Sequence, residues 1–262
     1  MSEHPRIGLI GFGRMGKAMA LGFARAGIEK TCVVVYDKVS QARADAESLG
    51  FRVVEKAEDA FTDSEIIIVA VKPGDVEEAL KDLADFASNK IVVSIAAAIP
   101  LKRFENLLPK STIYRAMPNI AVEINRGFIA LSPPSRKDEY IEKVFNLLGT
   151  VEWVDEKILD MLTFYSASTP AMVAELFDAF LLSALRAGVP YNIAKKALST
   201  VFQGVGALLE MKGSSELRDS VITPKGVTIK AIEKIYVYGA KQILLKALND
   251  AYDEYEQMLH RN

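Results

Sequence analysis

The hydrophobic positions of the chain follow two different patterns. Up to about residue 155, short runs rich in valine and isoleucine alternate with segments whose apolar residues recur at helical spacing, which predicts strand–helix–strand units around a parallel sheet. The run Ile66–Val71 is apolar throughout, so we expect it near the centre of the sheet, where helices cover both faces. The predicted strands are Arg6–Ile10, Thr31–Tyr36, Arg52–Val54, Glu65–Val71, Lys90–Ile95, Ile113–Met117, Phe128–Leu131 and Val151–Trp153.

The pattern changes after residue 155, where the alternation stops and long stretches rich in alanine and leucine begin. The expected helices run from Lys157 to Ala187 with an interruption near Pro170, from Pro190 to Lys212, and from Thr228 towards the C-terminus. The sequence therefore predicts an α/β domain over residues 1–155 and an all-helical domain over residues 156–262.

One predicted helix is too apolar for a helix with a single buried face. Its segment Ala171–Leu185 carries apolar residues on more than one side, which is typical of a helix covered from several directions. A helical domain of only about one hundred residues has little room to surround such a helix by itself. We therefore expect an obligate homodimer, in which the second copy supplies the missing cover.

A glycine-rich turn follows the first predicted strand directly and precedes a helical pattern over Lys17–Ala26. Its GxGxxG spacing permits a tight turn, a close approach of the backbone to a pyrophosphate and close packing of helix on strand. Amides at the new helix N-terminus then face the phosphates. A glycine turn without a ligand is the alternative for this motif alone. The predicted cofactor-binding residues of the turn are Gly11, Phe12, Gly13, Arg14, Met15 and Gly16.

Asp37 closes the second predicted strand, at the place where a carboxylate commonly binds the adenosine ribose of a dinucleotide. It favours NADH because it would repel the 2′-phosphate of NADPH, although Lys38 and Arg43 lie close enough in sequence to attract that phosphate. A simple turn residue is the alternative role for Asp37. The first domain is thus expected to be of the Rossmann type, with Asp37 and Lys38 at a site for NADPH or NADH.

The composition argues against several classes of function. There are 32 Lys and Arg against 34 Asp and Glu, a net charge of −2, so no broad basic surface for nucleic acid is expected. Cys32 is the single cysteine, which excludes an intramolecular disulfide and fits a reducing compartment. The N-terminus has too few apolar residues for a signal peptide, and Ala171–Val189 contains charged residues. We therefore expect a cytoplasmic protein without a membrane partner.

The histidine content narrows the chemistry further. The two histidines, His4 and His260, lie at the ends of the chain. Mechanisms that use a histidine as acid, base or metal ligand lose their usual residue, and no metal site is predicted. Ser-His-Asp hydrolysis and histidine-dependent hydroxy-acid dehydrogenation are disfavoured for the same reason.

Further motifs follow the ends of the predicted strands and continue into the helical part. They are Ala70-Val71-Lys72-Pro73, Ser94-Ile95-Ala96-Ala97, Met117-Pro118-Asn119, Ser166-Ala167-Ser168-Thr169-Pro170-Ala171, and the run from Leu217 to Ile229. In this order and at these spacings the chain resembles the pyrroline-5-carboxylate reductase family over nearly its whole length. The last of these motifs is the most specific.

The resemblance implies NAD(P)H-dependent reduction of 1-pyrroline-5-carboxylate, a small cyclic imine, to L-proline. It also implies a Rossmann domain followed by a helical dimerisation domain, and dimers that commonly assemble into larger oligomers. Further cofactor contacts carried over from the family are Val71, Lys72, Pro73 and Ala97. The substrate contacts carried over are Asn119, Thr223, Gly226, Val227 and Thr228.

The chemistry of a cyclic imine suits a chain without an internal histidine. The imine can enter as an iminium, which is already electrophilic at the carbon that accepts hydride, so catalysis rests mainly on positioning. The resemblance places the hydroxyl of Thr228 near the ring nitrogen, and we expect Thr228 to act as the catalytic residue that helps to deliver a proton. Its alternative role is that of a helix N-terminal residue bonded to backbone.

The chain departs from the family pattern where glycine is usual. Ala167, Thr169, Lys225 and Ala98 each add a side chain where backbone or ligand would approach closely. An imine reductase for another ring therefore stays open as an alternative. A regulator that senses NAD(H) without reducing anything is a second alternative, although it has no reason to keep the loop from Arg218 to Thr228.

Overall fold

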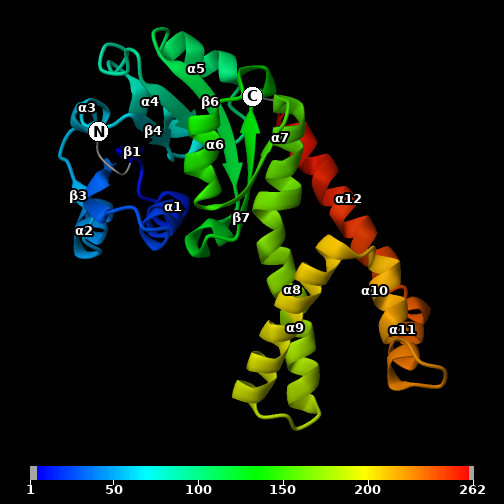
Figure 1. Cartoon of the computed structure of the whole chain (residues 1–262). Helices are drawn as coiled ribbons and strands as arrows, with labels where there is room; N and C mark the ends of the chain where they lie inside the picture. The colour runs from blue at the N-terminus through cyan, green and yellow to red at the C-terminus, as the bar shows by residue number, and fades with distance from the viewer. Residues whose placement is uncertain (1–4, 260–262) are drawn as a thin grey trace. The chain divides into compact units, whose positions relative to one another are not determined.

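The computed structural model describes residues 5–259, and an eight-stranded sheet forms the centre of its N-terminal part (Figure 1). Every strand expected from the sequence is present: β1 (Ile7–Ile10), β2 (Val33–Tyr36), β3 (Arg52–Val53), β4 (Ile66–Val69), β5 (Ile91–Ser94), β6 (Thr112–Pro118), β7 (Gly127–Ser132) and β8 (Gly149–Trp153). Their spatial order is β3-β2-β1-β4-β5-β6-β7-β8. All neighbours pair in parallel except β6 and β7, which confirms the mostly parallel sheet.

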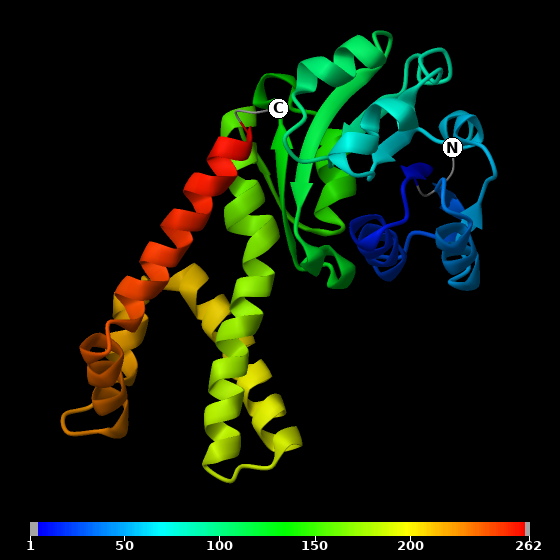
Figure 2. The same cartoon turned by 180° about the vertical axis from the view of Figure 1, so that it is seen from behind.

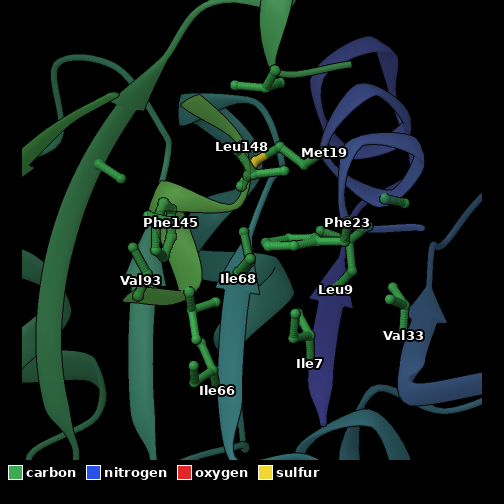
Figure 3. Packing of buried hydrophobic residues seen from close by; sticks show 14 of the residues in the cluster. Ile7, Leu9, Met19, Phe23, Val33, Ile66, Ile68, Val93, Phe145 and Leu148 are labelled. Atoms are coloured by element: carbon green, nitrogen blue, oxygen red, sulfur yellow. The ribbon is translucent and has the colours of Figure 1, made fainter. Parts of the chain in front are cut away.

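Strand β4 lies between β1 and β5 inside the sheet, as its continuous apolar sequence predicts. Its side chains alternate between the two faces: Ile66 and Ile68 join one buried cluster, and Ile67 and Val69 join the other. Figure 3 shows Ile66 and Ile68 in the first cluster. The sheet is therefore apolar on both sides.

Helices cover both faces of the sheet. They are α1 (Arg14–Arg25), α2 (Ser40–Ser48), α3 (Ala57–Thr62), α4 (Val76–Leu80), α5 (Leu101–Leu107) and α6 (Glu139–Asn146). Side chains of α1, α2 and α6 pack on the face of Ile66 and Ile68, where Phe23 of α1 and Phe145 of α6 are buried (Figure 3). Those of α3, α4 and α5 pack on the opposite face. This arrangement leaves the strand ends free to carry a site.

The C-terminal part is helical. It contains α7 (Glu156–Leu162), the π-helical segment η5 (Thr163–Ser168), α8 (Thr169–Arg186), α9 (Tyr191–Met211), α10 (Ser214–Val221), α11 (Val227–Val237) and α12 (Ala240–Leu259). The interruption expected near Pro170 is the π-helical segment. Proline lacks an amide hydrogen and crowds the carbonyl four residues earlier, here that of Ser166, so the helix widens just before Pro170 and then continues.

Two details of this part differ from the sequence prediction. Helix α10 was not expected, and the single helix expected from Thr228 onward is divided into α11 and α12. The division falls at Gly239, whose φ of +65° lies in the left-handed region that glycine adopts without strain. Contacts between residues group the chain into one compact unit up to Pro170 and a second unit from Ala171.

The second unit exposes an unusual amount of apolar surface. Figures 1 and 2 show α8 and α9 side by side, where Phe202 packs against Phe177 and Phe180 with ring centroids 5.4 and 5.9 Å away. Among the described residues of this unit, only Leu181 and Ala194 are buried hydrophobics, whereas Leu182 is 57% exposed. By length and composition alone, the continuous helix Glu156–Arg186 of 31 residues could also cross a membrane.

Candidate active site

The glycine turn lies between β1 and α1, at the carboxyl end of β1. Gly11 has a φ of +104°, and a Cβ there would lie 2.7 Å from the carbonyl oxygen of Ala70. A Cβ on Gly16 would lie 2.2 Å from the carbonyl oxygen of Gly11. Both distances are too short for any side chain, so these two glycines are required by the packing of the turn itself.

Gly13 has a different reason to be glycine. Apart from its two chain neighbours, no described residue has an atom within 4 Å of the position that its Cβ would take, and its backbone is extended, so the fold itself does not demand glycine here. Gly13 precedes the first residue of α1, and the first turn of that helix contains no acidic side chain. The free space beside a helix N-terminus without acids fits the pyrophosphate of a dinucleotide.

A cavity of about 510 Å³ opens beside this turn, between the carboxyl ends of β1, β2 and β4. The predicted cofactor residues that line it are Gly11, Gly13, Asp37, Lys38, Val71 and Lys72. They come from three loops that are far apart in sequence, and the parallel topology of the strands brings them to one edge. The cavity therefore has the position that an open α/β sheet offers to a dinucleotide.

Asp37 lines the cavity at the end of β2 and is held by hydrogen bonds on both carboxylate oxygens. Its Oδ2 accepts a hydrogen bond from the Phe12 amide at 2.7 Å, and its Oδ1 accepts one from the Val39 amide at 2.8 Å. The guanidinium of Arg43 donates to the Asp37 carbonyl at 2.7 Å. The carboxylate thus ties the glycine turn to the end of β2, which gives Asp37 a role in the fold besides any contact with a ribose.

The cations next to Asp37 are already paired with acids. Lys38 Nζ lies 2.8 Å from Asp75 and 3.2 Å from Glu78, and Arg43 lies 3.0 Å from Glu55. The hydrogen bonds that Lys38 donates to Asp75 and Glu78 raise the pKa of Lys38, and Lys38 in turn lowers the pKa of Asp75. The charges of Lys38 and Arg43 are therefore already balanced by carboxylates in this structure, before any phosphate binds.

Of the other predicted residues of the turn, Phe12 and Gly16 are buried, Met15 is partly buried and Arg14 is exposed. Phe12 is 4% exposed and packs edge-on against Phe51 with ring centroids 5.9 Å apart. Gly16 is buried in the first turn of α1. Phe12 and Gly16 therefore contribute to the packing of the turn. The predicted cofactor residues outside the lining of the cavity are Phe12, Arg14, Met15, Gly16, Pro73 and Ala97.

Ala97 and Asn119 follow β5 and β6 at the same edge of the sheet. Ala97 and Ala167 of η5 both pack against one small buried cluster that contains Met117. Asn119 Oδ1 accepts a hydrogen bond from the Ala121 amide at 3.2 Å, and its Nδ2 donates to Ser166 Oγ at 3.4 Å. The π-helical segment is therefore hydrogen-bonded to Asn119 and shares an apolar cluster with Ala97.

The predicted substrate loop lies in the second unit, at the start of α11. The Gly226 amide donates to the Thr223 carbonyl at 3.0 Å, and a Cβ on Gly226 would lie 2.3 Å from Thr223 Oγ1. Thr228 stands in the first turn of α11 and is partly exposed. Its hydroxyl has no hydrogen-bond partner within residues 5–259, so in this structure it does not bond to backbone as a helix N-terminal residue would.

Four residues stand where the family usually has glycine, and the structure accommodates their side chains in two ways. Ala98 and Lys225 keep a left-handed backbone, with φ of +59° and +61°, as glycine would. The Ala167 methyl packs into an apolar cluster, and Thr169 Oγ1 donates to the Tyr165 carbonyl at 2.7 Å. Alanine and lysine at a left-handed position carry local strain, whereas Ala167 and Thr169 do not.

Replacing Ala98 with glycine is expected to stabilise the protein by about 1 kcal/mol, because the left-handed strain of alanine is removed. Chemical denaturation measures the change. Asn125 provides the contrast: its φ is +58°, but its Nδ2 donates to the carbonyls of Gly22 and Leu147 at 2.7 and 2.6 Å. Asn125→Gly should therefore lose stability, and a loss in Ala98→Gly as well would contradict the assignment of strain.

Sequence reasoning missed one buried charge near this edge. Arg115 lies within β6, is 1% exposed, and forms ion pairs with Glu156 and Asp160. The available signal was a charged residue inside the apolar run Ile113–Met117, because a buried charge requires partners.

No group of three or more His, Cys, Asp or Glu in the described part of the chain could hold a metal ion.

The sequence is related to known proteins over more than nine tenths of its length. It is 33% identical to the pyrroline-5-carboxylate reductase of Aquifex aeolicus over 251 residues, which cover 93% of this chain and 94% of the relative. The chain belongs to the pyrroline-5-carboxylate reductase family. The reductase of Synechocystis is 30% identical over 264 residues, 97% of this chain and 98% of the relative.

Two family models match parts of the chain, and a solved structure has the same fold. Residues 156–258 match the model described as pyrroline-5-carboxylate reductase dimerisation, and residues 6–98 match NADP oxidoreductase coenzyme F420-dependent. A Plasmodium falciparum pyrroline carboxylate reductase with NADP bound has the same fold, with a TM-score of 0.84, 21% identity, and coverage of 98% of this chain and 99% of that one. As a member of the pyrroline-5-carboxylate reductase family, the chain is an oxidoreductase that uses a nicotinamide cofactor.

Proposed function

We propose that this protein reduces 1-pyrroline-5-carboxylate to L-proline with a hydride from NADH or NADPH. The observation that carries the proposal is the sequence similarity to curated reductases of this name: 33% and 30% identity over 93% and 97% of the chain. The cavity beside the glycine turn supports it, because its free space at Gly13 accommodates a dinucleotide pyrophosphate.

The residues of the cavity would hold the cofactor in a defined order. Gly11 and Gly13 would take the pyrophosphate, Asp37 the adenosine ribose, and Val71 and Lys72 would follow the dinucleotide along the strand ends towards Ala97. When bound, the reduced nicotinamide supplies the hydride. Asn119, Thr223, Gly226 and Val227 would orient the imine and its carboxylate, and Thr228 would hold or donate a proton at the ring nitrogen.

The direct test is to follow oxidation of NADH and NADPH by absorbance with 1-pyrroline-5-carboxylate, and with the six-membered homologue as comparison. Turnover of the five-membered imine supports the proposal. Turnover of the six-membered imine alone would identify an imine reductase for another ring. Binding of NADH without any turnover would overturn the proposal and leave a sensor of NAD(H).

We further propose that NADH is the preferred cofactor. The carboxylate of Asp37 faces the adenosine side of the cavity, and the neighbouring Lys38 and Arg43 are paired with acids, so a 2′-phosphate would meet repulsion without a free cation. Asp37→Asn removes the charge and keeps a side-chain oxygen for one amide. We expect it to raise the ratio of kcat/KM with NADPH to that with NADH about tenfold.

Steady-state kinetics with both cofactors measure this ratio. Asp45→Asn on α2 is the matched control, because Asp45 is exposed and bonds only to neighbours on its own helix. An unchanged ratio in Asp37→Asn would show that another residue sets the preference.

We also propose that residues 156–262 form a homodimerisation domain, and that dimers can assemble further in the cytoplasm. The match of residues 156–258 to a dimerisation family supports this, as does the exposed apolar surface of α8 and α9. In this proposal the apolar helix Glu156–Arg186 is covered by a second copy and not by lipid. Light scattering should give at least twice the chain mass of 28.8 kDa, and a stable monomer would contradict it.

A further inference from the structure

A row of buried polar residues crosses the sheet beneath α7. Arg115 of β6 is paired in register with Ser94 of β5 and Ser132 of β7, and none of the three is more than 1% exposed. Residues paired across neighbouring strands share a face, so the three side chains lie on one side of the sheet. This is the face that α7 covers (Figure 1).

The guanidinium of Arg115 joins three elements. Its Nη1 donates to Glu156 Oε1 at 2.8 Å, and its Nη2 donates to Asp160 Oδ1 at 2.6 Å. Glu156 Oε1 also accepts a hydrogen bond from the Leu101 amide, the first of α5, at 2.7 Å. One arginine of the sheet is thereby bonded to two successive turns of α7 and, through Glu156, to the start of α5.

Stability alone does not explain this network. Arg115 Nε and Ser132 Oγ are buried and have no hydrogen-bond partner within the described chain. Burying an arginine with one unsatisfied donor is unfavourable, and buried ion pairs are often matched or exceeded in stability by well-packed apolar residues. Apolar residues do not fix the orientation of their neighbours. A guanidinium does, because its N–H donors have a rigid geometry that holds each carboxylate in one place.

The element that this network fixes leads directly to the candidate site. Asp160 lies in the last turn of α7, and the π-helical segment η5 begins at Thr163. Within η5, Ser166 accepts the hydrogen bond from Asn119, and Ala167 packs against the same small buried cluster as Ala97. The distance along the helix from the ion pair to these contacts is only one to two turns.

We propose that Arg115 is a positioning residue of the reductase site: through Glu156 and Asp160 it sets the placement of η5 against Asn119 and Ala97. The inference rests on the proposed function, since it concerns the geometry in which the imine meets the cofactor. Arg115 itself is buried beneath α7 and touches neither of the predicted ligand-binding residues through any bond in the structure.

The test replaces the whole network, so that no unpaired charge is left behind: Arg115→Met with Glu156→Gln and Asp160→Asn. We expect this triple variant to fold, to bind NADH with an unchanged Kd measured by fluorescence, and to lose at least tenfold in kcat. Hydrogen exchange should be faster at the amides of residues 163–168 and unchanged in α1. A role in stability alone would leave kcat within about threefold of that of the unmodified protein, even if η5 exchanged faster, and that result would overturn the proposal.

Two further variants keep the outcome decisive. The exposed pair of Arg136 and Glu105, also 2.8 Å apart, gives the matched control Arg136→Met with Glu105→Gln, which should alter neither kcat nor exchange. If the triple variant does not fold, Asp160→Asn alone retains the bond of Arg115 to Glu156 and is measured in the same way. If the unmodified protein turns over no pyrroline-5-carboxylate, the proposed function fails, and hydrogen exchange alone decides whether Arg115 places η5.

Discussion

Valine in place of Gly13 is expected to weaken NADH binding at least about a hundredfold while the protein stays folded. The reason is the open space at this position: apart from the two chain neighbours, no described residue lies within 4 Å of a Cβ, so the branched side chain begins in free space and fills the place proposed for the pyrophosphate. A cost of about 1 kcal/mol is expected from the less favourable residue before α1. Fluorescence titration of NADH and thermal unfolding measure the two effects separately.

Gly16→Ala is the matched comparison within the same turn. Its methyl group would lie 2.2 Å from the Gly11 carbonyl oxygen, so this variant should lose both stability and NADH binding. Comparing Gly13→Val with Gly16→Ala therefore distinguishes a variant that only blocks NADH binding from one that also destabilises the fold. Gly13→Val that binds NADH normally would show that the dinucleotide does not pass Gly13.

Alanine in place of Thr228 is expected to lower kcat about a hundredfold or more, the range observed when a proton donor is removed. The Thr228 hydroxyl stands in the first turn of α11 without a hydrogen-bond partner in the described chain, so it is free to bond to the ring nitrogen of the imine. Thr228→Ser keeps the hydroxyl and should retain most of the activity. Steady-state rates measured at saturating NADH and varied imine concentration give kcat and KM for each variant.

A control distinguishes this chemistry from a general effect of removing threonine. Thr200 in α9 donates its hydroxyl to the Lys196 carbonyl at 3.0 Å, and Thr200→Ala should leave kcat unchanged. If Thr228→Ala kept kcat within about threefold of the unmodified protein, the substrate would be entering as a preformed iminium that needs no enzymic proton donor. A rise in KM alone would assign Thr228 to substrate binding.

The sheet could be predicted because each of its strands is locally encoded. Ile66–Val69 is apolar on both faces, and the glycines of the turn after β1 mark the start of α1 without reference to the rest of the chain. Helix α10 and the division at Gly239 were missed because a short exposed helix has weak periodicity and a single glycine inside a helical pattern does not show its φ.

The candidate site was predictable only in part. Motifs at the ends of parallel strands converge on one edge by topology, which brings Asp37 and Val71 to the cavity of Gly11. The bonds of Arg115 to Glu156 and Asp160 join residues 41 and 45 positions apart, and no local pattern specifies such a pairing. The inward packing of Phe12 was hidden for the same reason, because its partner Phe51 lies beyond the second strand.

The reversal of direction between β6 and β7 gives the sheet an edge without ligand-binding loops. Since β7 runs opposite to β6, the loop of residues 133–138 leaves the sheet at the edge away from the glycine turn, Asp37 and Asn119. Ser135 in this loop is exposed. With the native Cys32 replaced by serine, a cysteine introduced at Ser135 therefore carries a fluorophore that reports on tumbling or assembly of the reductase during turnover, with the dye far from the bound substrate and cofactor.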